Sequence, residues 1–412
     1  TNAHLTFAAF LLSGVALPAV AQLAPQPAPV SDPAPADDSS QNTVIVTGTR
    51  SPKAIDKVAG AVTVITPAEV QRSLTITEDA TAVLARTVPG YSESNQTMNT
   101  LGETMRGRTA LYMFDGIPQS TPLRDGSRNA TFTDMSTVQR IEVIGGASAA
   151  EGIGAAGGLI NYISKRAAEE GTHTGLTGPL RSQYRDASAI WKIGGTIAHK
   201  SGDFDVFAAA SYVDRGITYD ARGRRIGLSA SSSLADTKQV DFFLKVGHDF
   251  AGGTQRLEAT ASYFKLTAKG DYHYVAGSRA LGIPDTAEPG PPRDPVTGQL
   301  LFAPDFNRFQ QYALNYSNSD LVGGNLVVTG YFAKQEMRFP GDNSVDKQDP
   351  LISSGVIFDQ SEILSKKYGL RTSYTRPDFL TKGLELRFGV DLVHDQTRQY
   401  LALTNRVWVP PM

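Results

Sequence analysis

Two patterns of hydrophobic and polar positions divide the chain. Residues 43–166 mix short apolar runs with one stretch of helical spacing, whereas polarity alternates residue by residue from about residue 175 onward. The clearest alternating run is GLELRFGVDLVHD, residues 383–395. Its large apolar positions are Leu384, Leu386, Phe388, Val390 and Leu392. Because successive side chains of a strand point to opposite faces, this run predicts a strand with one apolar and one polar face.

Further alternating runs predict a sheet of many strands. They begin near Ile190, Asp203, Gln239, Gln255, Phe309, Gly324 and Lys367. Short turns such as 200–203 and 249–253 alternate with long, Pro-rich connections such as 276–305. This combination is typical of a transmembrane β-barrel, in which strands of about ten residues alternate apolar and polar positions. A soluble β-sandwich also alternates, but the tyrosine-rich strand ends and the long connection favour the barrel.

The first part of the chain predicts a small α+β domain. The apolar runs 43–48, 61–66, 141–144 and 159–164 are expected to be strands. Residues 109–118 are expected to form a strand and a tight turn at Asp115-Gly116. The spacing of apolar residues within 76–88 predicts a helix with Thr77 as its N-cap.

Gly152, Gly154 and Gly157 match the G-x-G-x-x-G pattern of dinucleotide-binding folds. That fold requires a helix to begin at the third glycine, so that its amides face the pyrophosphate. Here Gly157 is followed by Gly158 and then by LINYIS, a run with strand propensity. We therefore interpret these glycines as positions of close backbone approach rather than as a cofactor site.

The N-terminal residues predict export. LTFAAFLLSGVALPAV is a short apolar run, and Ala19-Val20-Ala21 is a cleavage motif before Gln22. We expect a signal peptide over residues 1–21 and a disordered Pro/Ala/Asp-rich tether over residues 22–42. No later window reaches the about 18 apolar residues of a spanning helix, so a membrane-spanning form must be a barrel.

Composition excludes several classes of function. The chain has no cysteine, which rules out a disulfide scaffold, a thiol nucleophile and a Cys-ligated metal. A formal net charge of −2 does not favour nucleic-acid binding. The six histidines show no metal-ligand spacing, and no catalytic serine motif is present, so we expect no enzyme, no cofactor and no protein-bound metal.

Five motifs in order resemble the plug domain of TonB-dependent outer-membrane receptors. They are TVIVTGTR (43–50), VLARTVPGY (83–91), MRGR (105–108), MFDGIPQ (113–119) and VQRIEVIGGASAAEGIGAAGGLINYISKR (138–166). Residues 125–144 and 311–340 are also similar to the ferric-aerobactin and related citrate–hydroxamate siderophore receptors. The chain departs from the family pattern at Gly145-Gly146 and at Glu151.

The resemblance implies a 22-stranded barrel with an N-terminal α+β plug in its lumen. On that basis the chain is expected to be a C-terminally truncated fragment, with a TonB box and plug over 43–166 and the first half of the barrel over 175–412. It also implies a monomer in the outer membrane of a Gram-negative bacterium, in contact with lipid. Such a receptor imports a ferric siderophore with energy from TonB, ExbB and ExbD, and the iron arrives already chelated.

The resemblance and the residue types together suggest roles for individual positions. The expected TonB box is Thr43, Val44, Ile45, Val46 and Thr47, a β-forming run after a flexible tether. The candidate ligand-binding residues are Arg108, Arg124, Arg128, Asn129, Tyr272 and Tyr274, since arginines pair well with the carboxylates of an anionic chelate. Solvated loop charges and an interfacial aromatic girdle are the alternatives for these residues.

Structural roles within the plug are expected for a second set of residues. These are Arg106, for which we expect an ion pair, Gly107, Asp115, Gly116, Glu142, Gly157, Gly158 and Asn161. For the whole protein, a TonB-dependent receptor of another cargo, such as haem, cobalamin or an oligosaccharide, is the main alternative. A passive porin and an exported enzyme are the others.

Overall fold

The computed structural model describes residues 45–46, 53–54, 61–99, 102–121, 123, 132–147, 154–229, 232–291, 300, 302–341 and 355–407. The expected signal peptide and tether lie outside this part of the chain, as do Thr43, Val44 and Thr47 of the expected TonB box. The other two residues of the box form strand β1 (Ile45–Val46), which pairs antiparallel with β2 (Lys53–Ala54).

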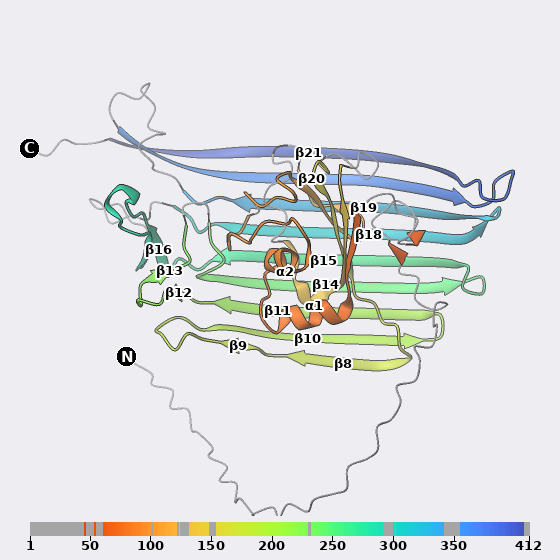
Figure 1. Cartoon of the computed structure of the whole chain (residues 1–412), viewed down its shortest axis with the longest axis horizontal. Helices are drawn as coiled ribbons and strands as arrows, with labels where there is room; N and C mark the ends of the chain where they lie inside the picture. Colours follow the sequence, from red (N-terminus) through yellow and green to blue (C-terminus); the bar gives the residue numbers. More distant parts are fainter. Residues whose placement is uncertain are drawn as a thin grey trace, which may run out of the picture. The chain divides into compact units, whose positions relative to one another are not determined.

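A five-stranded sheet and two helices form the domain that the resemblance identifies as a plug, and we use that name for it (Figure 1). The sheet order is β3-β6-β7-β4-β5, in which β4 and β7 are parallel and the other neighbours are antiparallel. The strands are β3 (Ala61–Ile65), β4 (Ala110–Phe114), β5 (Ile117–Pro118), β6 (Val138–Gly145) and β7 (Gly158–Ser164). The strands predicted from the apolar runs after residue 60 are thereby confirmed.

The helices differ in detail from the prediction. The expected helix is present as α2 (Ala80–Thr87), but its N-cap is Asp79 rather than Thr77. The carboxylate of Asp79 accepts hydrogen bonds from both the amide and the hydroxyl of Thr81, a pairing that the shorter Thr77 side chain does not make.

An additional helix, α1 (Pro67–Leu74), precedes α2, and a single-turn 3-10 helix, η3 (Met135–Thr137), precedes β6. Helix α1 begins with a capping box: the Glu69 carboxylate accepts the amide of Thr66 at 2.8 Å, and Thr66 Oγ1 accepts the amide of Glu69 at 3.4 Å. No helix in the described ranges is long and apolar enough to cross a membrane.

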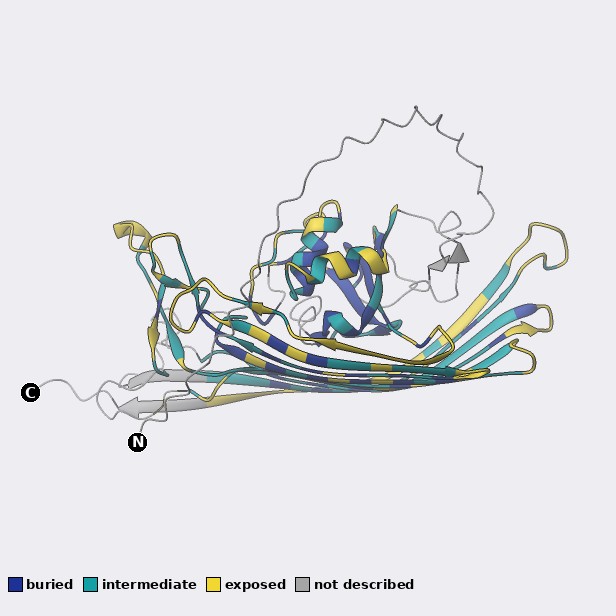
Figure 2. Cartoon of the chain, turned by 90° about the horizontal axis from the view of Figure 1, so that it is seen from below, coloured by how far each residue is buried: buried dark blue, intermediate teal, exposed yellow. Residues whose placement is uncertain are grey.

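A ten-stranded antiparallel sheet, here called the wall, forms the rest of the structure (Figures 1 and 2). Its order is β21-β20-β19-β18-β15-β14-β11-β10-β8, and β9 pairs with β10 off this path. The strands are β8 (Gly171–Thr177), β9 (Leu180–Arg181), β10 (Ile190–Ser201), β11 (Phe204–Arg215), β14 (Thr237–Phe250), β15 (Gln255–Ala268), β18 (Phe306–Leu321), β19 (Gly324–Arg338), β20 (Gly355–Arg376) and β21 (Leu386–Val407). Every expected wall strand is present, although β20 begins earlier than Lys367, and β8 and β9 were not predicted.

The two ends of the wall differ, as the turn lengths predict. At one end, the turn end, neighbouring strands are joined by short links such as 202–203 and 251–254. At the other, the loop end, long connections carry small hairpins and a 3-10 turn. These are β12 (Thr218–Tyr219) with β13 (Arg225–Ile226), η4 (Arg279–Leu281), and β16 (Tyr272–Val275) with β17 (Thr286–Pro289).

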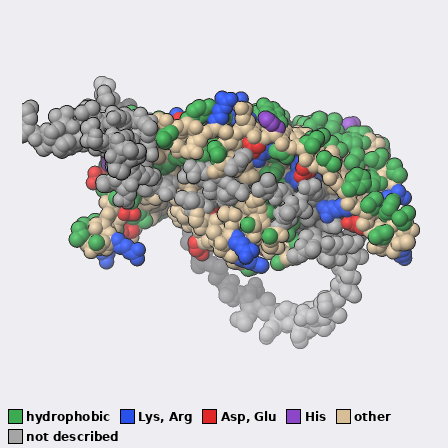
Figure 3. Space-filling model, turned by 90° about the horizontal axis from the view of Figure 1, so that it is seen from above, with side chains coloured by type: hydrophobic (Ala, Val, Ile, Leu, Met, Phe, Trp, Pro, Cys, Tyr) green, Lys and Arg blue, Asp and Glu red, His purple; other side chains and the backbone are tan. Residues whose placement is uncertain are grey.

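The wall has an exposed apolar face and a polar inner face. Phe388, Val390 and Leu392, from the clearest alternating run, are 59%, 55% and 61% exposed. Buried inner positions include Lys192 and Gln311 instead. Hydrophobic side chains gather along one side of the molecule in Figure 3. This inside-out distribution is the one a membrane barrel requires, and it argues against a soluble sandwich.

The last glycine of the G-x-G-x-x-G pattern, Gly157, and the next residue, Gly158, serve close packing. Gly157 is followed directly by strand β7, not by a helix. A Cβ atom on Gly157 would lie 2.7–2.9 Å from three backbone carbonyl oxygens, those of Met105, Arg108 and Thr109. Gly158 has φ +142°, and a Cβ there would overlap the Met105 side chain. The interpretation as close backbone approach is therefore confirmed at Gly157, while Gly152 lies outside the described residues.

Candidate functional site

The plug is attached to the inner face of the wall by apolar and polar contacts. Phe114 and Phe132 of the plug pack against Phe243 and Phe309 of the wall, with ring centres 5.9 and 5.3 Å apart. The first of the polar contacts is a buried ion cluster. The carboxylate of Asp134, the N-cap of η3, accepts hydrogen bonds from the ammonium of Lys192 on β10, with Nζ 3.0 Å from Oδ1 and 3.2 Å from Oδ2. Ser211 on β11 donates to the same carboxylate, and Glu78 lies 3.6 Å from the Lys192 ammonium. Burial would raise the pKa of Asp134, but Lys192 and these hydrogen bonds outweigh it and hold the pKa below its usual value.

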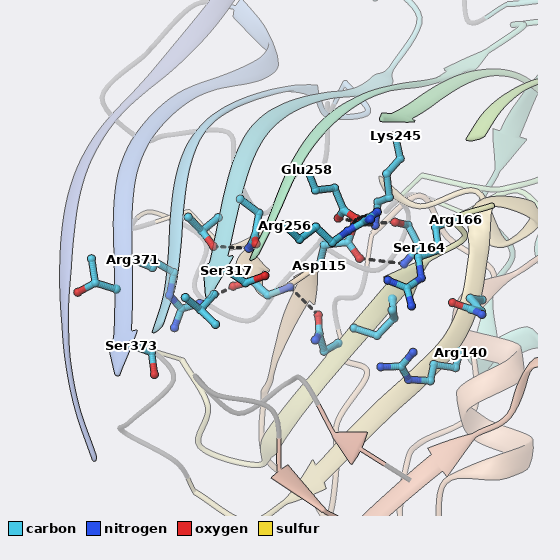
Figure 4. Close-up of a pocket in the computed structure, with 18 of the residues that line it drawn as sticks. Asp115, Arg140, Ser164, Arg166, Lys245, Arg256, Glu258, Ser317, Arg371 and Ser373 are labelled. Carbon is cyan, nitrogen blue, oxygen red and sulfur yellow. Dashed lines mark hydrogen bonds and ion pairs between the residues drawn. The ribbon is translucent and has the colours of Figure 1, made fainter. Parts of the chain in front are cut away.

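A second ion cluster joins the β4–β5 turn to the wall. Asp115, at φ 49° in the predicted Asp-Gly turn, accepts the amide of Ser164 at 2.9 Å and its hydroxyl at 2.6 Å. The same carboxylate lies 3.1 Å from the ammonium of Lys245 on β14. Lys245 also pairs with Glu258 at 3.4 Å, and Arg256 binds Glu258 at 3.0 Å (Figure 4). Asp115 is therefore both a turn residue and an anchor to the wall.

A third set of contacts joins wall side chains to plug carbonyl groups. Lys367 on β20 donates to the carbonyl of Ser120 at 2.7 Å, and Arg371 donates to that of Gly116. Gln311 on β18 donates to the carbonyl of Phe114 at 3.3 Å. Strands β18 and β20 thus bind the β4–β5 segment through its backbone.

A polar cavity of about 500 Å³ lies between the plug sheet and the wall (Figure 4). Its lining includes Asp115, Asn161, Arg166, Arg256 and Ser373. The Nδ2 atom of Asn161 and the hydroxyl of Ser373 are buried without a hydrogen-bond partner among the described residues. A polar cavity of this size with unpaired donors is suited to hold water.

The loop of the plug that faces the loop end of the wall, residues 92–99, is here called the apical loop. The carbonyl of Gln96 accepts the amide of Leu234 at 2.9 Å. The hydroxyl of Ser232 accepts the amide of Met98 and the side-chain amide of Asn99, both at 3.1 Å. Both Leu234 and Ser232 belong to the long connection between β11 and β14. The apical loop is therefore bound to a connection at the loop end.

The predicted ligand residues fall into three places. Arg124, Arg128 and Asn129 lie outside the described residues. Arg108 is exposed and has no side-chain partner among the described residues. Tyr272 and Tyr274 are partly buried in β16, where the Arg225 guanidinium lies 5.6 Å from the centre of the Tyr272 ring. The structure does not bring Arg108 and these tyrosines together.

The expected structural residues of the plug form local contacts. Arg106 (φ 53°) and Gly107 (φ 75°) make a tight turn, and the Arg106 amide donates to Gly90 at 2.7 Å. The expected ion pair of Arg106 is not found among the described residues, because its side chain is exposed and lies against Gly90. Buried Glu142 pairs with Arg140 at 2.7 Å. The Asn161 side-chain oxygen accepts the amide of Gly116 at 2.9 Å.

Sequence reasoning missed the residues that join the plug to the wall. Lys192 and Lys245 occupy inward positions of alternating strands, and a lysine at such a position was the available signal. Their partners could not be identified, since they lie far away in the sequence. In the described part of the chain, no three His, Asp or Glu side chains are grouped closely enough to hold a metal ion.

Comparison with known proteins identifies the domain and the fold. The sequence model of the TonB-dependent Receptor Plug Domain matches residues 54–159. The chain is 25% identical over 364 residues to the "Rhizobactin receptor" of Rhizobium meliloti (strain 1021), covering 86% of this chain and 46% of that protein. It is 26% identical over 385 residues to the "Ferric aerobactin receptor" of Klebsiella pneumoniae, covering 88% and 48%. The chain thus spans about half the length of the relatives that it matches.

The fold is also similar to that of a solved outer-membrane transporter structure. The unliganded ferric citrate transporter FecA superposes with a TM-score of 0.58 at 16% identity, covering 85% of this chain and 49% of that one. At this identity the likeness is one of fold. It confirms the predicted fold class, a receptor-type membrane barrel with an N-terminal α+β plug.

Proposed function

Because the chain has the plug domain and the fold of a TonB-dependent receptor, we propose that its protein imports a ferric siderophore across the outer membrane with energy transmitted by TonB. The observation that carries this proposal is the polar attachment of the plug. Lys192, Lys245 and Lys367 bind the plug through ion pairs and carbonyl groups. Water can replace these polar contacts when the plug moves, so they favour a plug that acts as a gate.

The cargo we propose is a ferric siderophore of the hydroxamate or citrate–hydroxamate type. The names of the rhizobactin and ferric aerobactin receptors support this class, and both relatives match most of the chain. The iron would arrive already chelated, so the protein needs no metal ligands of its own. The candidate contacts are Arg108, Arg124, Arg128, Asn129, Tyr272 and Tyr274.

The partner we propose is TonB, together with ExbB and ExbD in the inner membrane. Residues 43–47 would add a strand to the edge of a TonB sheet. The pairing of β1 with β2 supports this role because it places Ile45–Val46 in extended conformation. A full-length receptor that lacks residues 43–47 should bind cargo normally and import none; import by this variant would refute the assignment. We further propose a cleaved signal peptide and a monomer surrounded by outer-membrane lipid.

Growth under iron limitation tests the cargo. A deletion strain that carries the full-length gene is supplied with one purified iron chelate at a time: ferric aerobactin, another ferric hydroxamate or haem. We expect growth with the hydroxamate chelates. Rescue by haem alone would replace the siderophore proposal with the alternative cargo, and rescue without TonB would favour a passive pore.

A further inference from the structure

A buried carboxylate lies beneath the apical loop. Glu103 is 4% exposed, and no Lys, Arg or His side chain among the described residues pairs with it. Its Oε2 atom accepts the hydroxyl of Tyr91 at 3.2 Å, and its Oε1 atom accepts the amide of Asn95 in the apical loop at 3.4 Å. Both hydrogen bonds are long, so the loop is held only weakly at this point.

The groups around Glu103 do not compensate its charge. Tyr91 shares a hydrogen bond of 2.6 Å with Tyr112 of β4, and Tyr162 of β7 is a third buried phenol that interacts electrostatically with Tyr112 and Glu103. Asp79, the cap of α2, is a second carboxylate nearby, and it accepts the hydroxyl of Ser94 in the apical loop. Burial and then Asp79 raise the pKa of Glu103 to about 7. The side chain therefore changes charge near neutral pH.

Conformations that expose Glu103 to water favour its charged form. The segment that covers it is the apical loop, which contacts Glu103 through Asn95 and Asp79 through Ser94. By linkage, ionisation shifts the loop toward arrangements in which the carboxylate is hydrated. The neutral form of Glu103 gains little free energy from hydration, so it leaves the apical loop in place.

We propose that Glu103 is a positioning residue of the receptor: its neutral form keeps the apical loop against the plug, and its ionisation releases the loop and weakens cargo binding. This deepens the proposed function and rests on it for the cargo alone. On release, Gln96, Met98 and Asn99 of the apical loop would also lose their hydrogen bonds to the β11–β14 connection. The ionisation of Glu103 is in this way coupled to the contacts between the apical loop and the loop end of the wall.

Hydrogen exchange tests the loop without any cargo. In the full-length receptor in detergent, we expect the protection factors of residues 92–99 to fall roughly tenfold between about pH 6 and pH 8, if the open loop restores an ordinary glutamate pKa. Glu103→Gln is uncharged throughout and should keep the high protection at both pH values. Glu93→Gln, an exposed carboxylate in the same loop, is the matched control and should behave as the wild type. Constant protection in the wild type, or the same fall in Glu103→Gln, would overturn the inference.

The affinity of the full-length receptor for ferric aerobactin, measured at pH 6 and pH 8, tests whether the loop affects cargo binding. The wild type and Glu93→Gln should bind it more weakly at pH 8 than at pH 6, by a factor that exceeds the change in Glu103→Gln. Protonation of the chelate itself affects all three proteins equally and cancels in this comparison. A parallel pH dependence in Glu103→Gln would remove the role in binding. Failure of every chelate to bind any variant would refute the proposed cargo, while hydrogen exchange would still decide the loop.

Discussion

Replacing Lys192 with methionine tests whether the buried ion cluster attaches the plug. The side chains of Lys192 and Asp134 are 3% and 2% exposed, and their charged atoms lie 3.0 Å apart. Without the ammonium, the Asp134 carboxylate stays buried with only Ser211 and the Ser136 amide as donors. Removing one partner of a buried pair typically costs about 3–5 kcal/mol, so we expect Lys192→Met to destabilise the plug by that amount at neutral pH.

The measurement is a urea titration of the full-length receptor in detergent, with a fluorescent label on the plug. Residues 1–412 contain no cysteine, so Gln71→Cys on the exposed side of α1, with any cysteine elsewhere in the receptor replaced by serine, provides a single labelling site. Lys238→Met, an exposed lysine of β14, is the control and should change the unfolding free energy by less than about 0.5 kcal/mol. The double variant Lys192→Met with Asp134→Asn removes both charges and should recover most of the loss.

The pH dependence provides a second check on the same pair. In the wild type, the lowered pKa of Asp134 contributes stability above its usual value of 3.8, and this contribution is lost as the pH falls through the lowered pKa. In Lys192→Met, burial is unopposed and raises that pKa. The loss of stability should therefore be largest at neutral pH and shrink in acid. A loss below about 1 kcal/mol at neutral pH, or a double variant no more stable than the single one, would refute the reasoning.

Three further outcomes are expected of the full-length receptor. The raised pKa of Glu103 means that stability falls as the pH rises from 4.5 to about 7; urea titration should show Glu103→Gln more stable than the wild type at pH 8, by up to roughly 3 kcal/mol, and equal to it in acid. Gly158→Ala should lose about 3 kcal/mol or more, because φ is +142° and a Cβ meets the backbone of β6, whereas Gly330→Ala has open space and should be nearly neutral in the same titration. Arg108→Ala should weaken ferric aerobactin binding about tenfold by the loss of a charged hydrogen bond, and Arg166→Ala, another exposed arginine, should not.

Local patterns were sufficient to predict most elements of this fold. The alternation of apolar and polar residues located the wall strands, because one face of each strand carries apolar side chains along its whole length. The Asp115-Gly116 dipeptide located the turn between β4 and β5. The N-cap of α2 was misplaced because Thr77 and Asp79 are both good caps, and only the geometry of the preceding turn decides between them. Contacts between plug and wall were beyond such patterns: Lys192 and Asp134 are 58 residues apart, and nothing local to either one indicates the other.

The two carboxylates that anchor the plug are also bound within it. Asp134 accepts the amide of Ser136 as the cap of η3, and Asp115 accepts the amide and hydroxyl of Ser164. When the plug separates from the wall, Asp134 and Asp115 lose Lys192 and Lys245 as partners. Their hydrogen bonds within the plug remain, and water can solvate the carboxylate oxygens that the lysines had bound. Separation from the wall therefore breaks these ion pairs without breaking the hydrogen bonds that hold Asp134 and Asp115 within the plug. The plug carbonyl groups that Lys367, Arg371 and Gln311 bind must be solvated by water instead. These internal hydrogen bonds would let the plug stay folded if it separates from the wall, as the proposed gate requires.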